Sequence, residues 1–197
     1  GLADGYFVLP YTIQNYLADQ ITVPRFSTEL PEFAEAEKAV QARIDHLMGI
    51  KGKKSVDSIH KELGHIMWEY VGMGRTEEGL KTALKLLKDI RKEFETNLFI
   101  PGSTEGVNIE LEKALRLNDF ITMGELIAYD ALNRNESCGG HFREEYQTEE
   151  GEAKRDDENY FYVSCWEYQG SDDVAPVLYK EPLVYEAIKV QTRNYKS

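Results

Sequence analysis

The chain has 197 residues, of which 42% are hydrophobic, enough for one or two small cores. Its formal net charge of −12 argues against a nucleic-acid partner, because phosphate binding needs a basic stripe. No apolar run approaches the roughly 20 residues that cross a bilayer, and two cysteines are too few for a disulfide framework, so we expect a soluble protein of a reducing cytosol.

The chain opens on an apolar run, Tyr6–Leu9, which no charged leader precedes, and this argues against a secretory signal peptide. The first residue is Gly1 rather than methionine, which removal of a tag or processing would also explain. Because the apolar run opens at once, we expect a piece of a longer protein whose first residues continue an upstream helix. Apolar residues then recur at helical spacing, at Ile13, Leu17 and Ile21. They predict a helix from about Pro10 to Ile21, with a start near Leu2.

Two further helices follow in the first half of the chain. The first is expected from about Pro31 to Gly49, with a buried face formed by Ala36, Val40, Ile44 and Leu47. The second begins after Ser55, a residue type that caps helices, and closes at Gly72–Gly74. Its apolar face consists of Ile59, Leu63, Ile66, Met67 and Tyr70.

The next two predicted helices are the most regular. Thr76, followed by two glutamates, caps one of them. Its apolar positions are Leu80, Ala83, Leu84, Leu87, Ile90 and Phe94. The longest helix is expected from about Asn108 to Asn133, with apolar positions that include Leu111, Leu115, Phe120, Leu126, Ile127 and Ala131. Consecutive amphipathic helices joined by short turns predict an antiparallel bundle.

The periodicity ends after Asn135. An aromatic run, Tyr160–Trp166, predicts one strand, and Val177–Tyr179 predicts a second. Prolines bracket the second run, so we expect a short edge strand. This tail has too few apolar residues for a core of its own, and we expect it to lie over the bundle or over a neighbour.

Enzyme motifs are not evident in the sequence. The pair Gly72 and Gly74 lacks the third glycine of a phosphate loop. His60 and His65 stand about 140° apart around a helix, so they do not form a two-histidine metal face. Cys138 is a possible nucleophile, but we expect a small buried hydrophobe there instead.

The segment 136–146 carries the strongest functional signal of the chain. A glycine pair, a histidine and an arginine follow the longest helix directly, and glycines allow the backbone to approach another surface closely. His141 is the functional candidate by spacing alone, with a satisfied structural histidine as the more common alternative. A second turn of arginine and acids, 155–159, opens the aromatic run.

These residues resemble the succinate dehydrogenase/fumarate reductase flavoprotein family. The segment Leu63–Arg75 is similar to that family's helix with a leucine, a methionine and then Val-Gly-x-x-Arg. Glu136–Glu144 resembles its Glu-Ser-Arg-Gly-Ala-His-x-Arg turn, and Arg155–Tyr160 resembles its Arg-Asp-Asp-Glu-Asn-Trp segment. The sequence departs from the family at Cys138, where arginine is usual, and at Gly140, where alanine is usual.

The resemblance implies the C-terminal region of such a flavoprotein. Residues 1–24 are then the terminal helix of the flavin domain, 25–135 a spectrin-repeat-like helical bundle, and 136–197 an irregular, partly β tail. The expected fold class is mainly α. His141, Arg143 and Arg155 are expected to form a turn that docks against the flavin domain, while no catalytic, cofactor-binding or metal-binding residue is expected in this chain.

By the same resemblance, the full-length protein interconverts succinate and fumarate with FAD, and this chain alone binds no flavin tightly and is inactive. Its expected partners are its own upstream flavin and capping domains and an iron-sulfur subunit, with neither nucleic acid nor direct membrane insertion. The expected location is the cytoplasm, peripheral on the membrane through partner subunits. Two alternatives remain: the C-terminal domain of an L-aspartate oxidase, and a freestanding helical protein-interaction module.

Overall fold

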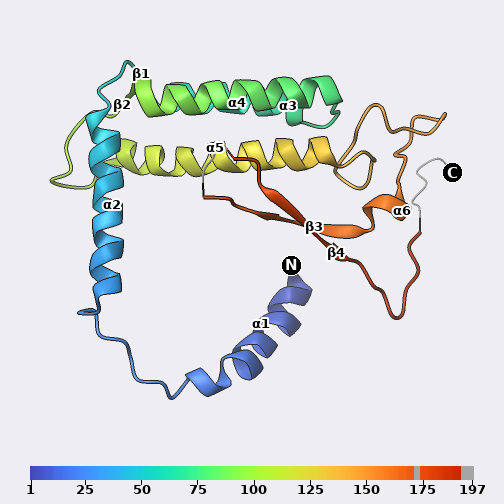
Figure 1. Ribbon diagram of the computed structural model, residues 1–197, viewed down its shortest axis with the longest axis horizontal. Coiled ribbons are helices and arrows are strands. Elements are labelled where there is room, and N and C mark those ends of the chain that lie inside the picture. Colours follow the sequence, from blue (N-terminus) through green and yellow to red (C-terminus); the bar gives the residue numbers. More distant parts are fainter. Residues whose placement is uncertain (171–173, 192–197) are drawn as a thin grey trace. The chain divides into compact units, whose positions relative to one another are not determined.

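The computed structural model describes residues 1–170 and 174–191. The chain forms two compact units that divide after Asp45 (Figure 1). The described part is mainly helical and adds two small two-stranded sheets. The predicted fold class, a helical bundle with a partly β tail, is therefore confirmed. Within the described residues, no helix is both long enough and apolar enough to span a bilayer.

The first unit consists of helical segments with no buried side chain. Its elements are η1 (Asp4–Val8), α1 (Leu9–Tyr11), η2 (Thr12–Tyr16), η3 (Ala18–Gln20) and the larger part of α2 (Pro31–Gly49). The predicted first helix and the bounds of the second are thus confirmed. The predicted buried face of α2 is wrong over most of its length: Ala36 and Val40 are exposed, Ile44 is half-buried and only Leu47 is buried. The reason is that a helical period marks an apolar face without requiring a neighbour that covers it.

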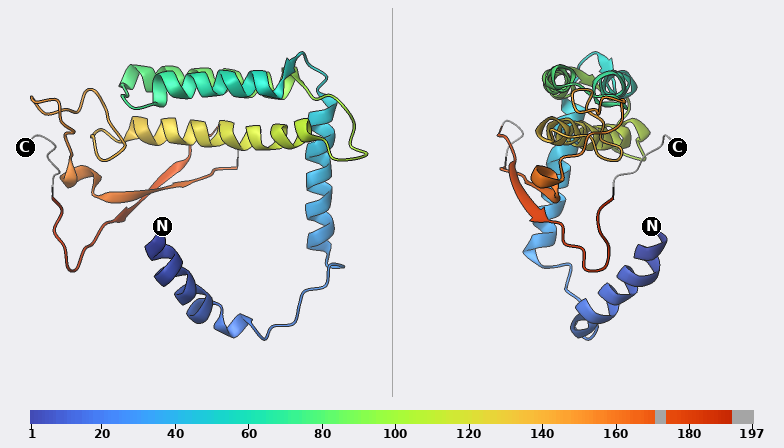
Figure 2. Two further views of the ribbon diagram at one scale, coloured as in Figure 1. Left: turned by 180° about the vertical axis from the view of Figure 1, so that it is seen from behind. Right: turned by 90° about the vertical axis from the view of Figure 1, so that its right-hand side faces the viewer.

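Three helices form the core of the second unit: α3 (Val56–Val71), α4 (Glu77–Asn97) and α5 (Ile109–Asn133). The end-on view of Figure 2 shows them as the corners of a triangle. The predicted caps are present, because the Ser55 hydroxyl accepts from the Ser58 amide at 3.2 Å and the Thr76 hydroxyl from the Gly79 amide at 3.0 Å. The core between the helices includes Ile59, Leu63, Leu80, Ala83, Leu87, Phe94, Ala114, Leu117, Ile121 and Ala128.

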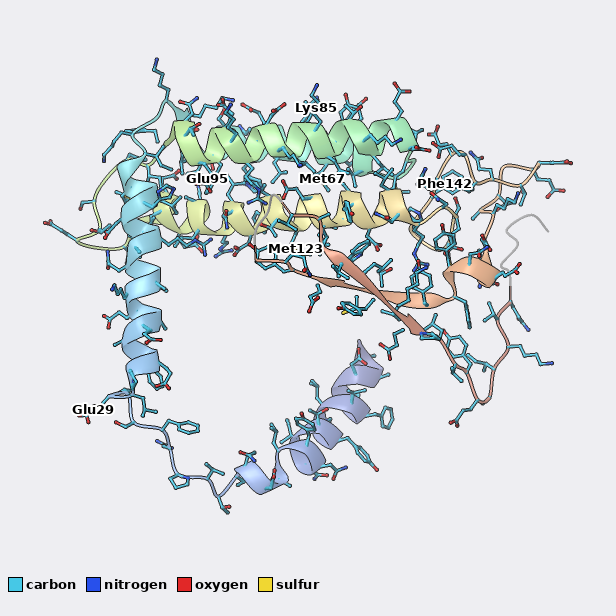
Figure 3. The ribbon with its side chains drawn as sticks, viewed as in Figure 1. Glu29, Met67, Lys85, Glu95, Met123 and Phe142 are labelled. Carbon is cyan, nitrogen blue, oxygen red and sulfur yellow. The ribbon has the colours of Figure 1, made fainter. Side chains whose placement is uncertain are left out.

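Elements of the bundle approach one another closely at two places. At one end, β1 (Lys54–Ser55) pairs in parallel with β2 (Leu98–Phe99), and the Gly52 amide donates to the Leu98 carbonyl at 2.8 Å. Midway along the bundle, Met67 lies between the α3–α4 layer and α5 (Figure 3), where its sulfur faces Gly124 of α5. A side chain at Gly124 would meet that sulfur at 3.2 Å.

The tail contributes α6 (Asp157–Tyr160), β3 (Tyr162–Glu167) and β4 (Val177–Pro182). The two strands pair antiparallel, from Tyr162 opposite Pro182 to Glu167 opposite Val177. Both predicted strands are present, but β3 begins two residues later than expected, because Tyr160 lies in α6, and β4 continues three residues further. Trp166 of β3 donates its indole N–H to the Asp130 carboxylate of α5 at 2.7 Å and packs edge-on against Tyr129. The tail therefore lies over the bundle, as expected.

Candidate docking site at the end of the bundle

The chain reverses direction immediately after α5 in a tight turn. The Cys138 amide donates to the His141 carbonyl at 2.8 Å, and the His141 amide donates back to the Cys138 carbonyl at 3.1 Å. Gly139, the first residue between them, has a φ of 59°, which residues with a side chain rarely adopt. The glycine pair therefore makes a two-residue turn whose tip, Cys138–Gly140, is exposed.

The residues after the turn are joined to the connection between α3 and α4. The Arg75 amide donates to the Phe142 carbonyl at 3.0 Å, and the Glu144 amide donates to the Arg75 carbonyl at 2.8 Å. Figure 3 shows Phe142 among the loops beyond the C-terminal end of α5. Two segments distant in the sequence, around residues 75 and 143, thus meet at one end of the bundle.

Arg143 is the largest fully buried side chain described, and it binds the last turn of α5. Its Nη1 donates to the carbonyls of Ala131 at 3.1 Å and Leu132 at 3.4 Å. A cation at this position complements the unpaired carbonyls and the negative end of the helix dipole. The remaining Nη2 has no hydrogen-bond partner in the described chain, and the guanidinium lies 5.4 Å from the centre of the Tyr146 ring.

Glu145 links Arg143 to the first turn of α4. One carboxylate oxygen accepts from Arg143 Nε at 3.1 Å, and the other accepts from the Glu77 amide at 2.6 Å. Burial acts to raise the pKa of Glu145, but these hydrogen bonds outweigh it, so that the pKa is lowered. The pair therefore ties the C-terminal end of α5 to the N-terminal end of α4.

His141 bridges two other segments of the site. Its Nδ1 lies 2.9 Å from Arg75 Nη1, and its Nε2 lies 2.9 Å from the Arg134 carbonyl oxygen. A guanidinium only donates and a carbonyl only accepts, so these two distances fit a neutral ring that carries its proton on Nε2. Burial lowers the pKa of His141, the nearby guanidinium groups lower it further, and the bond to the Arg134 carbonyl opposes them.

Arg134 holds the tail against the end of α5. Its guanidinium donates to the carbonyls of Tyr160 at 3.1 Å and Tyr162 at 3.0 Å, and it lies over both tyrosine rings. It also pairs at 2.8 Å with Glu136, which is only 3% exposed and whose second oxygen accepts from the Asp156 amide. The predicted site did not include Arg134, Glu136 or Asp130, because nothing in the local sequence signals their long-range contacts.

The three predicted site residues occupy two neighbouring turns. His141 and Arg143 lie in one cluster, while Arg155 pairs with Asp157 at 2.6 Å and donates to the Gln191 carbonyl at 3.2 Å. The hydrogen bond to Asp157 raises the pKa of Arg155. Cys138 is exposed, so its expected burial is wrong, because it forms part of the exposed tip of the turn.

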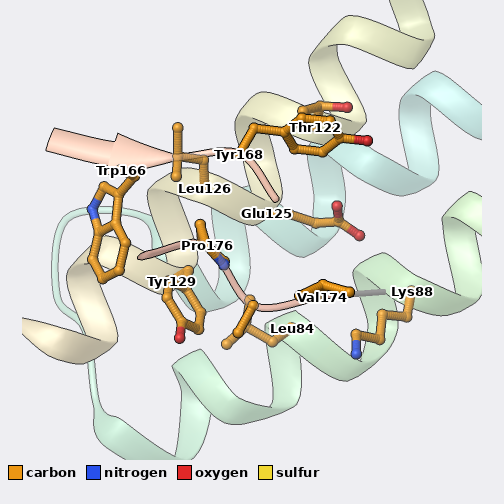
Figure 4. Close-up of a pocket in the computed structure, with 11 residues that line it drawn as sticks. Leu84, Lys88, Thr122, Glu125, Leu126, Tyr129, Trp166, Tyr168, Val174 and Pro176 are labelled. Carbon is orange, nitrogen blue, oxygen red and sulfur yellow. The ribbon is translucent and has the colours of Figure 1, made fainter. Parts of the chain in front are cut away.

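Trp166 and Leu126 line two hollows. The more polar one, the polar hollow, has a volume of about 500 Å³, and its lining includes Arg75, Asp130, Cys138 and His141. The apolar one, of about 370 Å³ (Figure 4), has walls that include Leu84, Leu126, Tyr129, Val174 and Pro176. The arginines of the polar hollow already donate to the chain itself, and the described residues include no cluster of metal-ligating side chains.

Comparison with known families matches residues 60–195 to the family described as the fumarate reductase flavoprotein C-terminus. An uncharacterized FAD-dependent oxidoreductase of Methanocaldococcus jannaschii is 31% identical over 112 residues, 57% of this chain and 20% of that protein. An L-aspartate oxidase of Nicotiana tabacum is 37% identical over 88 residues, 45% of this chain and 13% of the oxidase.

The fumarate reductase flavoprotein subunit of Proteus vulgaris is 29% identical over a longer stretch of 148 residues, 73% of this chain and 24% of that subunit. The chain thus spans about a quarter or less of each of these relatives. Among solved structures, a quinol fumarate reductase of E. coli matches with a TM-score of 0.67 and 21% identity, over 87% of this chain and 28% of that chain. At this identity the likeness establishes the fold.

Proposed function

Since the chain belongs to the family of fumarate reductase flavoprotein C-terminal domains, we propose that it is the helical scaffold of an FAD-dependent enzyme that interconverts succinate and fumarate. The observation that carries this proposal is the family match over residues 60–195. Within this scaffold, 1–24 is assigned to the end of the flavin domain, 25–135 to the helical domain and 136–197 to the tail.

FAD is proposed to lie in domains outside this chain. The polar hollow fits the cofactor poorly, because the guanidinium groups of Arg75 and Arg134 are already engaged by carbonyls, a histidine and a carboxylate of the chain itself. We therefore assign no catalytic, cofactor-binding or metal-binding residue to this chain, and we expect it to be inactive alone.

The turn that carries His141 and Arg143 is proposed to dock against the flavin domain, with Arg155 in the neighbouring turn. Arg143 is fully buried, so its contribution is to hold the backbone of the turn in place, and the exposed tip at Cys138–Gly140 makes the contact. The first unit exposes many large apolar side chains, and an exposed apolar surface of this extent is typical of an interface. This surface supports the proposal that the chain packs against a neighbouring domain. The exposed large apolar side chains of the first unit include Leu2, Tyr6, Phe7, Val8, Leu9, Tyr11, Ile13, Tyr16, Leu17 and Ile21.

An iron-sulfur subunit is the second proposed partner, and association with the cytoplasmic membrane is proposed to be peripheral and to come through partner subunits. Nucleic acid is not proposed as a partner, because the chain carries a net charge of −12.

L-aspartate oxidase is the alternative parent enzyme. The higher identity of the Nicotiana tabacum oxidase, 37% over 88 residues, favours it. The longer match to the Proteus vulgaris subunit, 148 residues, favours fumarate reductase, as does the Arg-Asp-Asp-Glu segment at Arg155–Glu158.

The substrate distinguishes the two. We expect the product of the whole gene to oxidise a reduced dye when fumarate is added, and to leave L-aspartate unchanged under air. Oxidation of aspartate instead would move the chain to the sibling enzyme. A product with neither activity and no flavin would leave the freestanding helical interaction module as the better interpretation.

A further inference from the structure

We propose that His141 is a proton-sensitive lock, which adds to the contacts that hold the turn 136–146 on the bundle while the ring is neutral and is lost when the ring is protonated. The effect of this lock on docking rests on the proposed function, whereas the lock itself is a property of this chain.

The geometry defines the locked state. Nδ1 accepts from Arg75 at 2.9 Å while Nε2 donates to the Arg134 carbonyl at 2.9 Å, so one neutral ring joins the α3–α4 connection to the end of α5. A proton added at Nδ1 would point at a donor, and the bond to Arg75 would be lost. Gly139 and Gly140 meet no atom within 4 Å of an added Cβ, so the tip of the turn borders open space.

The charges around His141 oppose protonation from three elements. Arg75 faces it from the α3–α4 connection, Arg134 from the end of α5 and Arg143 from the turn. The acids nearby are committed elsewhere: Glu136 pairs with Arg134, Glu145 pairs with Arg143, and Asp130 accepts from Trp166 while acting on Arg75. The other ionisable groups of the two turns are Cys138, Glu144, Tyr146, Arg155, Asp156, Asp157 and Glu158. The excess of guanidinium groups means that an imidazolium would be repelled rather than paired.

The sign of the pH effect follows from the lowered pKa of His141. The released turn takes up a proton near the ordinary pKa of 6.5, whereas the locked turn takes it up only at lower pH. The lock is therefore fully closed above pH 6.5 and loosens as the pH falls below that value. Each unit by which the locked pKa lies below 6.5 corresponds to about a tenfold loss of locking.

Nuclear magnetic resonance on this chain tests the lock directly. Ring ¹⁵N shifts are expected to show the Nε2–H tautomer of His141 at pH 7.5, with a pKa below 6.5. The protection of the Arg75 and Glu144 amides against hydrogen exchange, corrected for intrinsic rates, is expected to fall as the pH drops below 6.5. The fall should be about tenfold for each unit by which the measured pKa of His141 lies below 6.5. An Nδ1–H tautomer, or a pKa at or above 6.5, would overturn the proposal.

A matched pair of variants separates the lock from general acid sensitivity. The amide of His141→Gln offers one acceptor and one donor but does not titrate, so the variant should keep the protection seen at pH 7.5 and lose its pH dependence. His65→Gln, at an exposed position of α3, should behave as the parent chain does. An unchanged pH dependence in His141→Gln would contradict the proposal. The tautomer, the pKa and the amide protection are all measured on this chain without a flavin domain. A failure of the docking proposal would appear in a separate experiment. In that case the amides of the turn would be no better protected against hydrogen exchange in the product of the whole gene than in this chain.

Discussion

Replacing Arg143 by alanine is expected to lower the free energy of unfolding by about 3–5 kcal/mol. The substitution leaves the carbonyls of Ala131 and Leu132 and one oxygen of Glu145 without their donor, and it opens a cavity at a fully buried site. Arg143→Lys should recover only part of the loss, because an ammonium cannot reach the helix carbonyls and the carboxylate with the fixed fork of a guanidinium. Urea denaturation followed by tryptophan fluorescence measures the difference.

Arg116→Ala is the matched control for Arg143. Arg116 is an exposed arginine of α5 that pairs with Glu112 one turn earlier, and such pairs contribute about 0.3–0.5 kcal/mol. A loss at Arg143→Ala no larger than the loss at Arg116→Ala would show that the buried contacts do not hold the end of the bundle.

The second large effect is expected at the opposite end of the bundle, for Gly52→Ala. A Cβ at Gly52 would lie 2.0 Å from the backbone carbonyl carbon of Asn97, a distance that real side chains do not reach. Relief requires movement of the backbone that pairs β1 with β2, so we expect a loss of at least about 2 kcal/mol of stability. The same denaturation experiment measures it.

Gly64→Ala is the control for this substitution, and it should act in the opposite direction. Gly64 lies in the middle of α3, is exposed and has no atom within 4 Å of an added Cβ. Alanine there removes the entropic cost of a helical glycine, so the chain should gain about 0.5–1 kcal/mol. Equal effects of the two substitutions would mean that the contact at Gly52 is not tight.

Most of the helical fold is predictable from the sequence, because the signals are local. The caps at Ser55 and Thr76 give the first residues of α3 and α4, and the glycines at 72 and 74 give the end of α3. The spacing on α2 predicts the helix equally well but not its burial, since a helical period shows which face is apolar and not whether anything covers it.

The candidate site is predictable only in part. The glycine pair and the histidine identify the turn, and the resemblance adds Arg143 and Arg155. Local sequence gives no sign that Arg134 binds carbonyls 26 and 28 residues later, or that Asp130 accepts from Trp166. The exposure of Cys138 is not predictable from the local sequence for a related reason. The side of the turn that faces solvent depends on the segment at Arg75, which pairs with the turn and is distant in the sequence.

The location of the flavin tests the central claim most directly. The product of the whole gene and the 197-residue chain would be purified in parallel, and bound FAD would be measured from visible absorbance and after denaturation. The account predicts flavin in the whole product and none in this chain. Flavin retained by the 197-residue chain alone, or absent from both proteins, would contradict the assignment of this chain as the scaffold of a flavoenzyme.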